Sequence, residues 1–248
     1  MNMKMKSLSL AVLGLAGLAF AGSASAACVA GNLSAWSATQ QAAGTVTVVA
    51  GGLNTPPSEC KINTTLTGNS GSAGAYVRDD TPANEARYRA QFLINIDTLS
   101  GINGTQSVKV FGASTATPSQ SIAELVTLTV FGNAAGTTKI LGISTVDTAA
   151  SANFYKQSST VPLTGLTGTI RVEIDYVKGA AGTLKVWVNN TVEASPNVTL
   201  TANNNAWGGT DSVILGLSGA SPGYRAANLN KIVSFDQFDS RRQTFIGG

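Results

Sequence analysis

The chain contains two consecutive stretches of alternating pattern, TIRVEIDYV at Thr169–Val177 and GTLKVWV at Gly182–Val188. In the first stretch, apolar side chains occupy every second position and polar or charged residues stand between them. Side chains two apart share one face of a strand, so this period predicts two strands that each bury one face. The segment 178–182 between them is rich in Gly and Ala and predicts a tight connection, hence an antiparallel hairpin.

The same period extends outward along the chain. Alternate apolar residues of Ala86–Leu99 predict a long strand with one buried face, formed by Tyr88, Ala90, Phe92, Ile94 and Ile96. Further strands are expected at Thr45–Val49, Lys61–Leu66, Ser107–Gly112, Leu125–Gly132, Thr138–Thr145, Ser212–Ser218 and Lys231–Phe238. Only Ser119–Val126 and Thr148–Tyr155 suggest short helical turns. Many strands joined by short turns predict an all-β fold, an antiparallel β-sandwich of the jelly-roll type.

The first 26 residues have the pattern of a cleavable export signal. Lys4 and Lys6 precede the apolar run Leu8–Phe20, and small residues then lead to Ala24-Ser25-Ala26. The apolar run is short for a membrane span, so cleavage is favoured over an uncleaved anchor. The sequence therefore predicts a secreted or periplasmic protein with one sandwich domain at residues 27–248 and no membrane span after cleavage.

The net charge, the cysteines and the absence of histidine limit which functions the chain can have. Removal of Lys4 and Lys6 lowers the formal net charge from +3 to +1, which gives no electrostatic basis for binding nucleic acid or an anionic membrane. Cys28 and Cys60 are the two cysteines, and an exported chain favours a disulfide between them over two separate buried thiols. The chain has no histidine, which excludes Ser-His-Asp and Cys-His catalysis and the usual zinc ligand sets.

The paired strands also resemble a known group of folds. The segments 169–176 and 182–189, followed by Ile214–Gly219 and Val233–Asp239, are similar to the paired and closing strands of the concanavalin A-like lectin/glucanase and laminin-G jelly rolls. Tyr88–Phe92 resembles an early core strand of that group, and the resemblance spans roughly residues 76–242. The end of the chain, residues 238–247, resembles uncharacterised secreted bacterial proteins of this fold.

The resemblance suggests one catalytic candidate and one metal. Glucanases of this fold carry an E-x-D-x-(x)-E strand, which Glu173 and Asp175 match in part. The third carboxylate is replaced by Val177 or Lys178, so no catalytic residue and no enzymatic activity are predicted. Glu173 and Asp175 are instead expected to be outward charges, paired with Arg171 or Lys185. The group often binds calcium, but the aspartates at 79, 80, 147, 211 and 236 form no D-x-D-x-D loop. No cofactor is expected, with a structural calcium ion left open.

Aromatic residues suggest a carbohydrate site. Trp207 lies in the amide-rich segment 203–209, and Tyr224, Arg225 and Asp211 are its expected neighbours, with Trp187 as a further candidate. The alternative is that Trp187 and Trp207 only pack against the sandwich. The sequence therefore predicts a non-catalytic, lectin-like protein that binds a glycan or extracellular polysaccharide. A self-associating structural or adhesive surface protein and a degenerate glycoside hydrolase are the alternatives.

Overall fold

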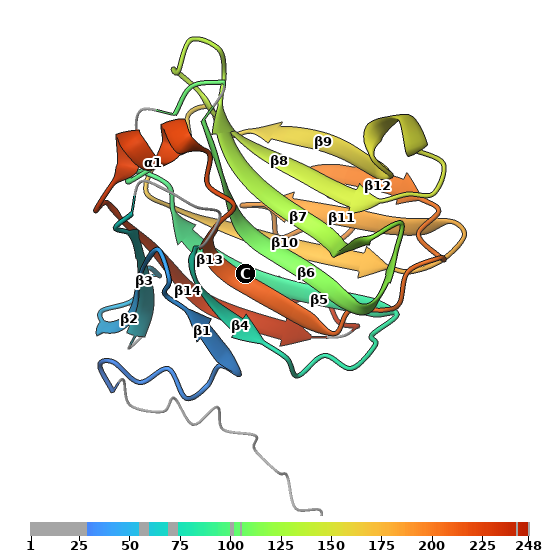
Figure 1. Ribbon diagram of the computed structural model, residues 1–248, viewed down its shortest axis with the longest axis horizontal. Helices are drawn as coiled ribbons and strands as arrows, with labels where there is room; N and C mark the ends of the chain where they lie inside the picture. The colour runs from blue at the N-terminus through green and yellow to red at the C-terminus, as the bar shows by residue number, and fades with distance from the viewer. Residues whose placement is uncertain are drawn as a thin grey trace, which may run out of the picture.

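Two antiparallel sheets pack face to face in the computed structural model, with β6, β7 and β8 in front of β10 and β11 in Figure 1. The structure describes residues 29–54, 60–68, 74–99, 102–104, 106–241 and 243–247. The predicted export signal and Cys28 lie outside these residues, so cleavage and the disulfide remain predictions.

Each sheet has seven strands. Sheet A runs in the order β1 (Ala38–Gln40), β4 (Ala75–Asp79), β13 (Ser212–Ser218), β6 (Ser107–Ser119), β7 (Ile122–Gly132), β8 (Lys139–Val146) and β9 (Lys156–Pro162). Sheet B runs in the order β12 (Val198–Ala202), β11 (Gly182–Val188), β10 (Thr169–Val177), β5 (Arg87–Asn95), β14 (Ile232–Arg241), β3 (Cys60–Leu66) and β2 (Gly44–Ala50). The prediction of an antiparallel β-sandwich is confirmed.

The core lies between the sheets and is made by the alternate residues that the sequence assigns to it. Tyr88, Ala90 and Phe92 of β5 are fully buried. Phe92 stacks on Phe111 of sheet A, with 5.6 Å between the ring centroids, and lies 6.4 Å from the ring of Phe235. This aromatic contact joins the two sheets at the centre of the sandwich.

One local expectation is wrong. The helical turn expected at Ser119–Val126 is absent, because β6 and β7 form a hairpin there whose turn residues Gln120 and Ser121 have positive φ. Helix α1 (Pro222–Asn228) follows β13, since Ser221 caps it and Pro222 suits the first helical turn. None of the helices in the described part of the chain has the length and hydrophobicity that a membrane crossing requires.

Candidate functional site

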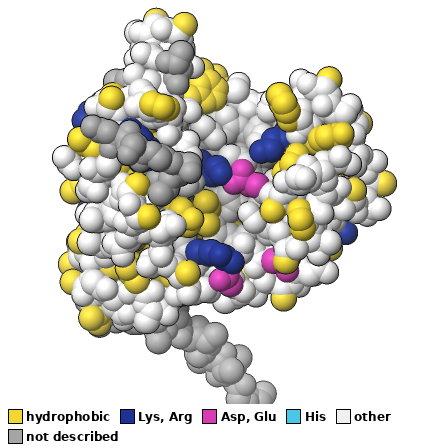
Figure 2. Space-filling model, in the orientation of Figure 1, with side chains coloured by type: hydrophobic (Ala, Val, Ile, Leu, Met, Phe, Trp, Pro, Cys, Tyr) yellow, Lys and Arg dark blue, Asp and Glu magenta, His cyan; other side chains and the backbone are white. Residues whose placement is uncertain are grey.

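The outer face of sheet A contains a hollow lined by charged side chains. Figure 2 shows basic and acidic groups gathered in this hollow, on the face that carries β6 and β7 in Figure 1. Strand alternation brings Lys109 of β6, Glu124 of β7 and Lys156 of β9 to this face. Their side chains are 22%, 25% and 33% exposed, so they are partly desolvated and still accessible.

Glu124 lies at the centre of the hollow. The ammonium group of Lys109 donates to its Oε1, and Lys156 Nζ lies 3.8 Å from its Oε2. The hydroxyl of Thr127 also donates to Oε2, at 2.9 Å. Two ammonium groups around one carboxylate leave a net positive charge, and the contacts hold both lysines in place over the sheet.

Two glycines stand on this part of sheet A. A Cβ on Gly112 would lie 3.1 Å from Glu124 Oε1, so the carboxylate of Glu124 packs closely over Gly112. Gly216 of β13 has φ +134°, and a Cβ there would come within 2.7 Å of the Cα of Tyr76. Strand β13 therefore carries no side chain at Gly216, whereas Ile214 lies on this face beside Gly112.

Strand β4 contributes a tyrosine and an arginine to the same face. Tyr76 pairs in register with Gly216, and Arg78 pairs with Ile214, which in turn pairs with Gly112. Arg78 Nε donates to Asp80 at 2.6 Å, and both side chains are largely exposed. Tyr76, Arg78, Lys109, Glu124 and Lys156 together are called the cationic trough below.

The cationic trough can bind carboxylate groups and offers one phenol as a proton donor or acceptor. Sequence reasoning missed it because its five residues come from four strands that only the sheet order brings together. The one local signal is the spacing of Tyr76 and Arg78, which places both side chains on one face of a strand.

The residues of the predicted carbohydrate site do not come together. Gly208, beside Trp207, donates to the carbonyl of Thr117, whereas Ser221 at the start of α1 donates to the carbonyl of Ser107. These positions lie at opposite ends of β6, about 30 Å apart along an extended strand. Trp207 is therefore far from Tyr224 and Arg225 of α1.

The predicted site residues are also occupied by internal contacts. Trp207 is 1% exposed, and its indole Nε1 donates to the carbonyl of Ile122 at 2.9 Å. Asp211 accepts from the backbone N–H groups of Asn84 and Ala116 and so joins two loops near Trp207. Tyr224 and Arg225 are each 1% exposed, and burial raises the pKa of Tyr224 well above its ordinary value. Trp187 is on sheet B, where its Nε1 donates to the carbonyl of Val192.

Glu173 and Asp175 point outward from sheet B, as the sequence indicates, but they are buried. Residues 243–247 cross this face, and the backbone N–H groups of Ile246 and Gly247 donate to the two oxygens of Glu173. Asp175 pairs with Arg87 and Arg89 of the neighbouring strand β5, in place of the expected Arg171 or Lys185. Neither carboxylate is open to a substrate in this arrangement.

The same segment covers the rest of this face. The ring of Phe245 lies 5.4 Å from that of Trp187 and 5.4 Å from the guanidinium carbon of Arg89. Arg89 also pairs with Glu193 at 2.7 Å and lies over the ring of Trp187. Arg89, Glu173, Asp175, Trp187 and Phe245 are called the sheet B cluster below.

The sheet B cluster makes the folding stability of the protein depend on pH. Burial raises the pKa of Glu173 above its ordinary value of 4.5, despite the hydrogen bonds from Ile246 and Gly247. The carboxyl of Glu173 then binds its proton more tightly in the folded state than in the unfolded state. Protonated Glu173 therefore stabilises the folded state, and this contribution is complete below pH 4.5. It is lost as the pH rises through the raised pKa.

We expect the stability of the wild type relative to Glu173→Gln to fall as the pH rises above 4.5. The slope between the ordinary and the raised pKa should approach about 1.4 kcal/mol per pH unit, because the difference is one bound proton. Urea unfolding of both proteins over a pH series measures this. Parallel pH profiles for the two proteins would show that Glu173 titrates normally.

The aspartates considered for calcium serve other purposes in the described residues. Asp147 accepts from the N–H groups of Ala149 and Asn203, and Asp236 accepts from the N–H of Leu53. In the described part of the chain, no group of three or more acidic, cysteine or histidine side chains could hold a metal ion. The expectation of no cofactor, with a structural calcium ion left open, stays a prediction.

Comparison with known proteins identifies the fold. No protein-family model and no curated protein sequence matches the chain. The solved structure of the alginate lyase Aly36B is similar over 73% of this chain and 80% of its own, with 17% identity and a TM-score of 0.52. A mutant of that lyase in complex with alginate trisaccharide gives a TM-score of 0.54 with 15% identity, over 74% of this chain and 82% of its own. The cellulose-induced protein Cip1 covers 82% of this chain and 88% of its own, with 15% identity and a TM-score of 0.52.

These likenesses support a β-sandwich of the jelly-roll type, and they correct two functional expectations. The predictions of a non-catalytic lectin-like protein and of no enzymatic activity are wrong, because the similar structures include alginate lyases. Those predictions weighed histidine-dependent catalysis, zinc sites and the carboxylates of Glu173 and Asp175, and they did not weigh lyase chemistry.

Proposed function

We propose that the chain is a polysaccharide lyase that cleaves an acidic polysaccharide by β-elimination in the cationic trough. The observation that carries the proposal is the position of Tyr76 on the outer face of sheet A, which also carries the ammonium groups of Lys109 and Lys156. The fold shared with alginate lyases supports it, since alginate is a polymer of uronic acids.

The reaction matches the groups that this face offers. In β-elimination, a base removes the proton from the sugar carbon next to the carboxylate. The electron pair left on that carbon forms a carbon–carbon double bond, the glycosidic C–O bond breaks, and the leaving oxygen takes up a proton. Cations beside the carboxylate stabilise the negative charge that develops on it. The reaction needs neither a nucleophile nor a histidine, so the composition of the chain is no obstacle.

Each residue of the trough then has a role. Lys109 and Lys156 bind the uronate carboxylate, and Glu124 holds their ammonium groups in position through the contacts described above. Tyr76 is the one phenol of the trough. Its oxygen takes the proton from the sugar carbon and gives a proton to the leaving oxygen. Arg78, two positions along β4, binds the carboxylate of a neighbouring sugar. Gly112 and Gly216 carry no side chain, which leaves the polymer room on either side of Ile214.

The activity is tested by incubating the purified chain with alginate and other uronate polysaccharides. Cleavage by elimination should produce an ultraviolet absorbance from the new double bond next to the carboxylate. Tyr76→Phe should lower kcat by about 10²- to 10⁴-fold, because it removes the proton-exchanging group. Lys109→Met should lower kcat and raise KM, because it removes a cation that binds the carboxylate and stabilises the charge that develops on it.

Ser158→Ala is the matched control, since Ser158 is on β9 of the same sheet and takes no part in the proposed chemistry. It should leave kcat and KM unchanged. The proposal fails if no uronate polysaccharide gives an unsaturated product, or if Tyr76→Phe keeps the full kcat of the wild type.

Export would place this activity outside the cytoplasm, where acidic polysaccharides are found. The N-terminal sequence pattern supports a secreted or periplasmic location, and the same setting favours the disulfide between Cys28 and Cys60.

A further inference from the structure

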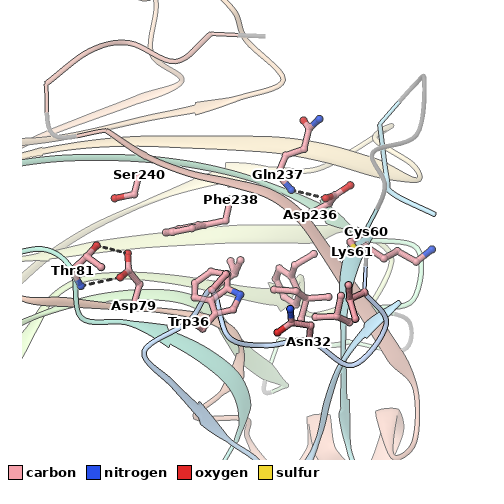
Figure 3. Close-up of a pocket in the computed structure, with 16 residues that line it drawn as sticks. Asn32, Trp36, Cys60, Lys61, Asp79, Thr81, Asp236, Gln237, Phe238 and Ser240 are labelled. Carbon is pink, nitrogen blue, oxygen red and sulfur yellow. Dashed lines mark hydrogen bonds between the residues drawn. The ribbon is translucent and has the colours of Figure 1, made fainter. Parts of the chain in front are cut away.

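A separate, partly open cavity of about 590 Å³ is lined by residues of both sheets (Figure 3). Its walls include Leu215 of sheet A and Val48, Ile62 and Phe235 of sheet B. The segment before β1 closes one side with Asn32, Ala35 and Trp36. The volume is within the range of cavities that hold small ligands.

Two aromatic rings line the cavity. The ring centroids of Trp36 and Phe238 are 5.0 Å apart, and the rings are tilted by 42°. Figure 3 shows both side chains in the cavity, Trp36 from the N-terminal segment and Phe238 from β14. Aromatic faces arranged in this way suit contact with a flat apolar molecule.

A bulge in β14 brings Phe238 and Ser240 to the cavity. The register of β14 against β5 shifts between Asp236 and Asp239, and Gln237 has a positive φ of 45°. Since Phe235 points inward, unbroken alternation would turn both 238 and 240 outward. Such bulges re-aim side chains and are common beside binding sites. The bulge strains the backbone at Gln237, and in return it turns Phe238 and Ser240 toward the cavity.

One end of the cavity is polar. Asp79 lies there and accepts from the backbone N–H and the hydroxyl of Thr81, at 2.8 and 3.1 Å. The hydroxyl oxygen of Ser240 is buried and has no hydrogen-bond partner in the described structure. A buried hydroxyl without a partner is costly, so this atom is available to a ligand.

We propose that this cavity binds a small aromatic molecule with one hydroxyl or amine group. The rings of Trp36 and Phe238 would hold its apolar part, while Ser240 and Asp79 would hold its polar group. The site is distinct from the cationic trough, because Asp79 points inward from β4 whereas Tyr76 and Arg78 point outward. The proposal therefore does not depend on the lyase activity.

The test uses N-phenyl-1-naphthylamine, an apolar fluorescent probe with a single N–H donor. Titration of the full chain should give a saturable fluorescence increase with one probe per chain. Ala35→Trp should weaken binding at least tenfold, because Ala35 lines the cavity in the segment that closes it and the larger side chain fills the space. Trp36→Phe should retain binding but reduce energy transfer from tryptophan to the probe.

Phe154→Ala is the control, because Phe154 is 84% exposed and takes no part in the lining. It should leave binding and energy transfer unchanged. Circular dichroism checks that each variant is folded, and Ala35→Phe replaces Ala35→Trp if the latter does not fold. A signal that rises without saturation, or an affinity that neither Ala35 variant changes, overturns the proposal.

Discussion

Replacing Asp175 with alanine should lower the free energy of unfolding by about 3–5 kcal/mol. Asp175 accepts hydrogen bonds from Arg87 at 2.8 and 2.9 Å and from Arg89 at 2.9 Å. Arg89 is 1% exposed, so removal of Asp175 leaves a buried guanidinium whose remaining ion pair in the described residues is with the exposed Glu193, beside the weaker influence of Glu173. Chemical denaturation of the wild type and the variant measures the difference.

The control is Asp80→Ala, which breaks the exposed ion pair with Arg78. That change should cost no more than about 1 kcal/mol, because exposed pairs are screened by water. Equal and small effects for Asp175→Ala and Asp80→Ala would show that water reaches Arg89 and that segment 243–247 does not seal the sheet B cluster.

Replacing Trp207 with alanine should destabilise the protein by about 3–5 kcal/mol, because a large side chain leaves the core and a cavity remains. The indole is 1% exposed and belongs to the main hydrophobic core. Thermal or urea unfolding measures the loss. Trp207→Phe should retain much of the packing and lose the hydrogen bond to Ile122, at a cost of about 1 kcal/mol for that bond.

Phe154→Ala gives the comparison for an exposed aromatic side chain, and it should change stability by less than about 0.5 kcal/mol. If Trp207→Ala unfolds like the wild type, the indole does not pack as described and its role as a ligand contact regains support.

The strands could be predicted because a half-buried strand imposes its period on the local sequence. Tyr88, Ala90 and Phe92 alternate with polar residues, and each is buried as expected. The same pattern misleads on the opposite face, where Arg89 is buried and Phe245 of a distant segment packs on it. The sequence of a strand does not predict which distant segment packs on its polar face.

The candidate site could not be predicted for a related reason. Tyr76 and Arg78 come from β4, whereas Lys109, Glu124 and Lys156 come from β6 to β9, and only the order of strands in sheet A, with β13 between β4 and β6, places them on one face. Sequence reasoning favoured Trp207 because aromatic residues in polar loops resemble sugar-binding loops. The deciding information was its burial, which depends on Ile122 and the β6–β7 hairpin.

The strand order also sets a sequence of events for folding. Strands β6 to β9 are successive neighbours and can pair as soon as they exist, since their contacts are local. Strand β5 pairs with β10 and β14, which come much later in the chain. Strand β4 is connected to β6 only through β13, which also comes late in the chain. The part of the trough that carries Lys109, Glu124 and Lys156 can therefore form early in folding. Tyr76 joins it later, when β4 pairs with β13. Refolding should show a slow final phase in which the proposed lyase activity and the completed pairing of sheet B appear together.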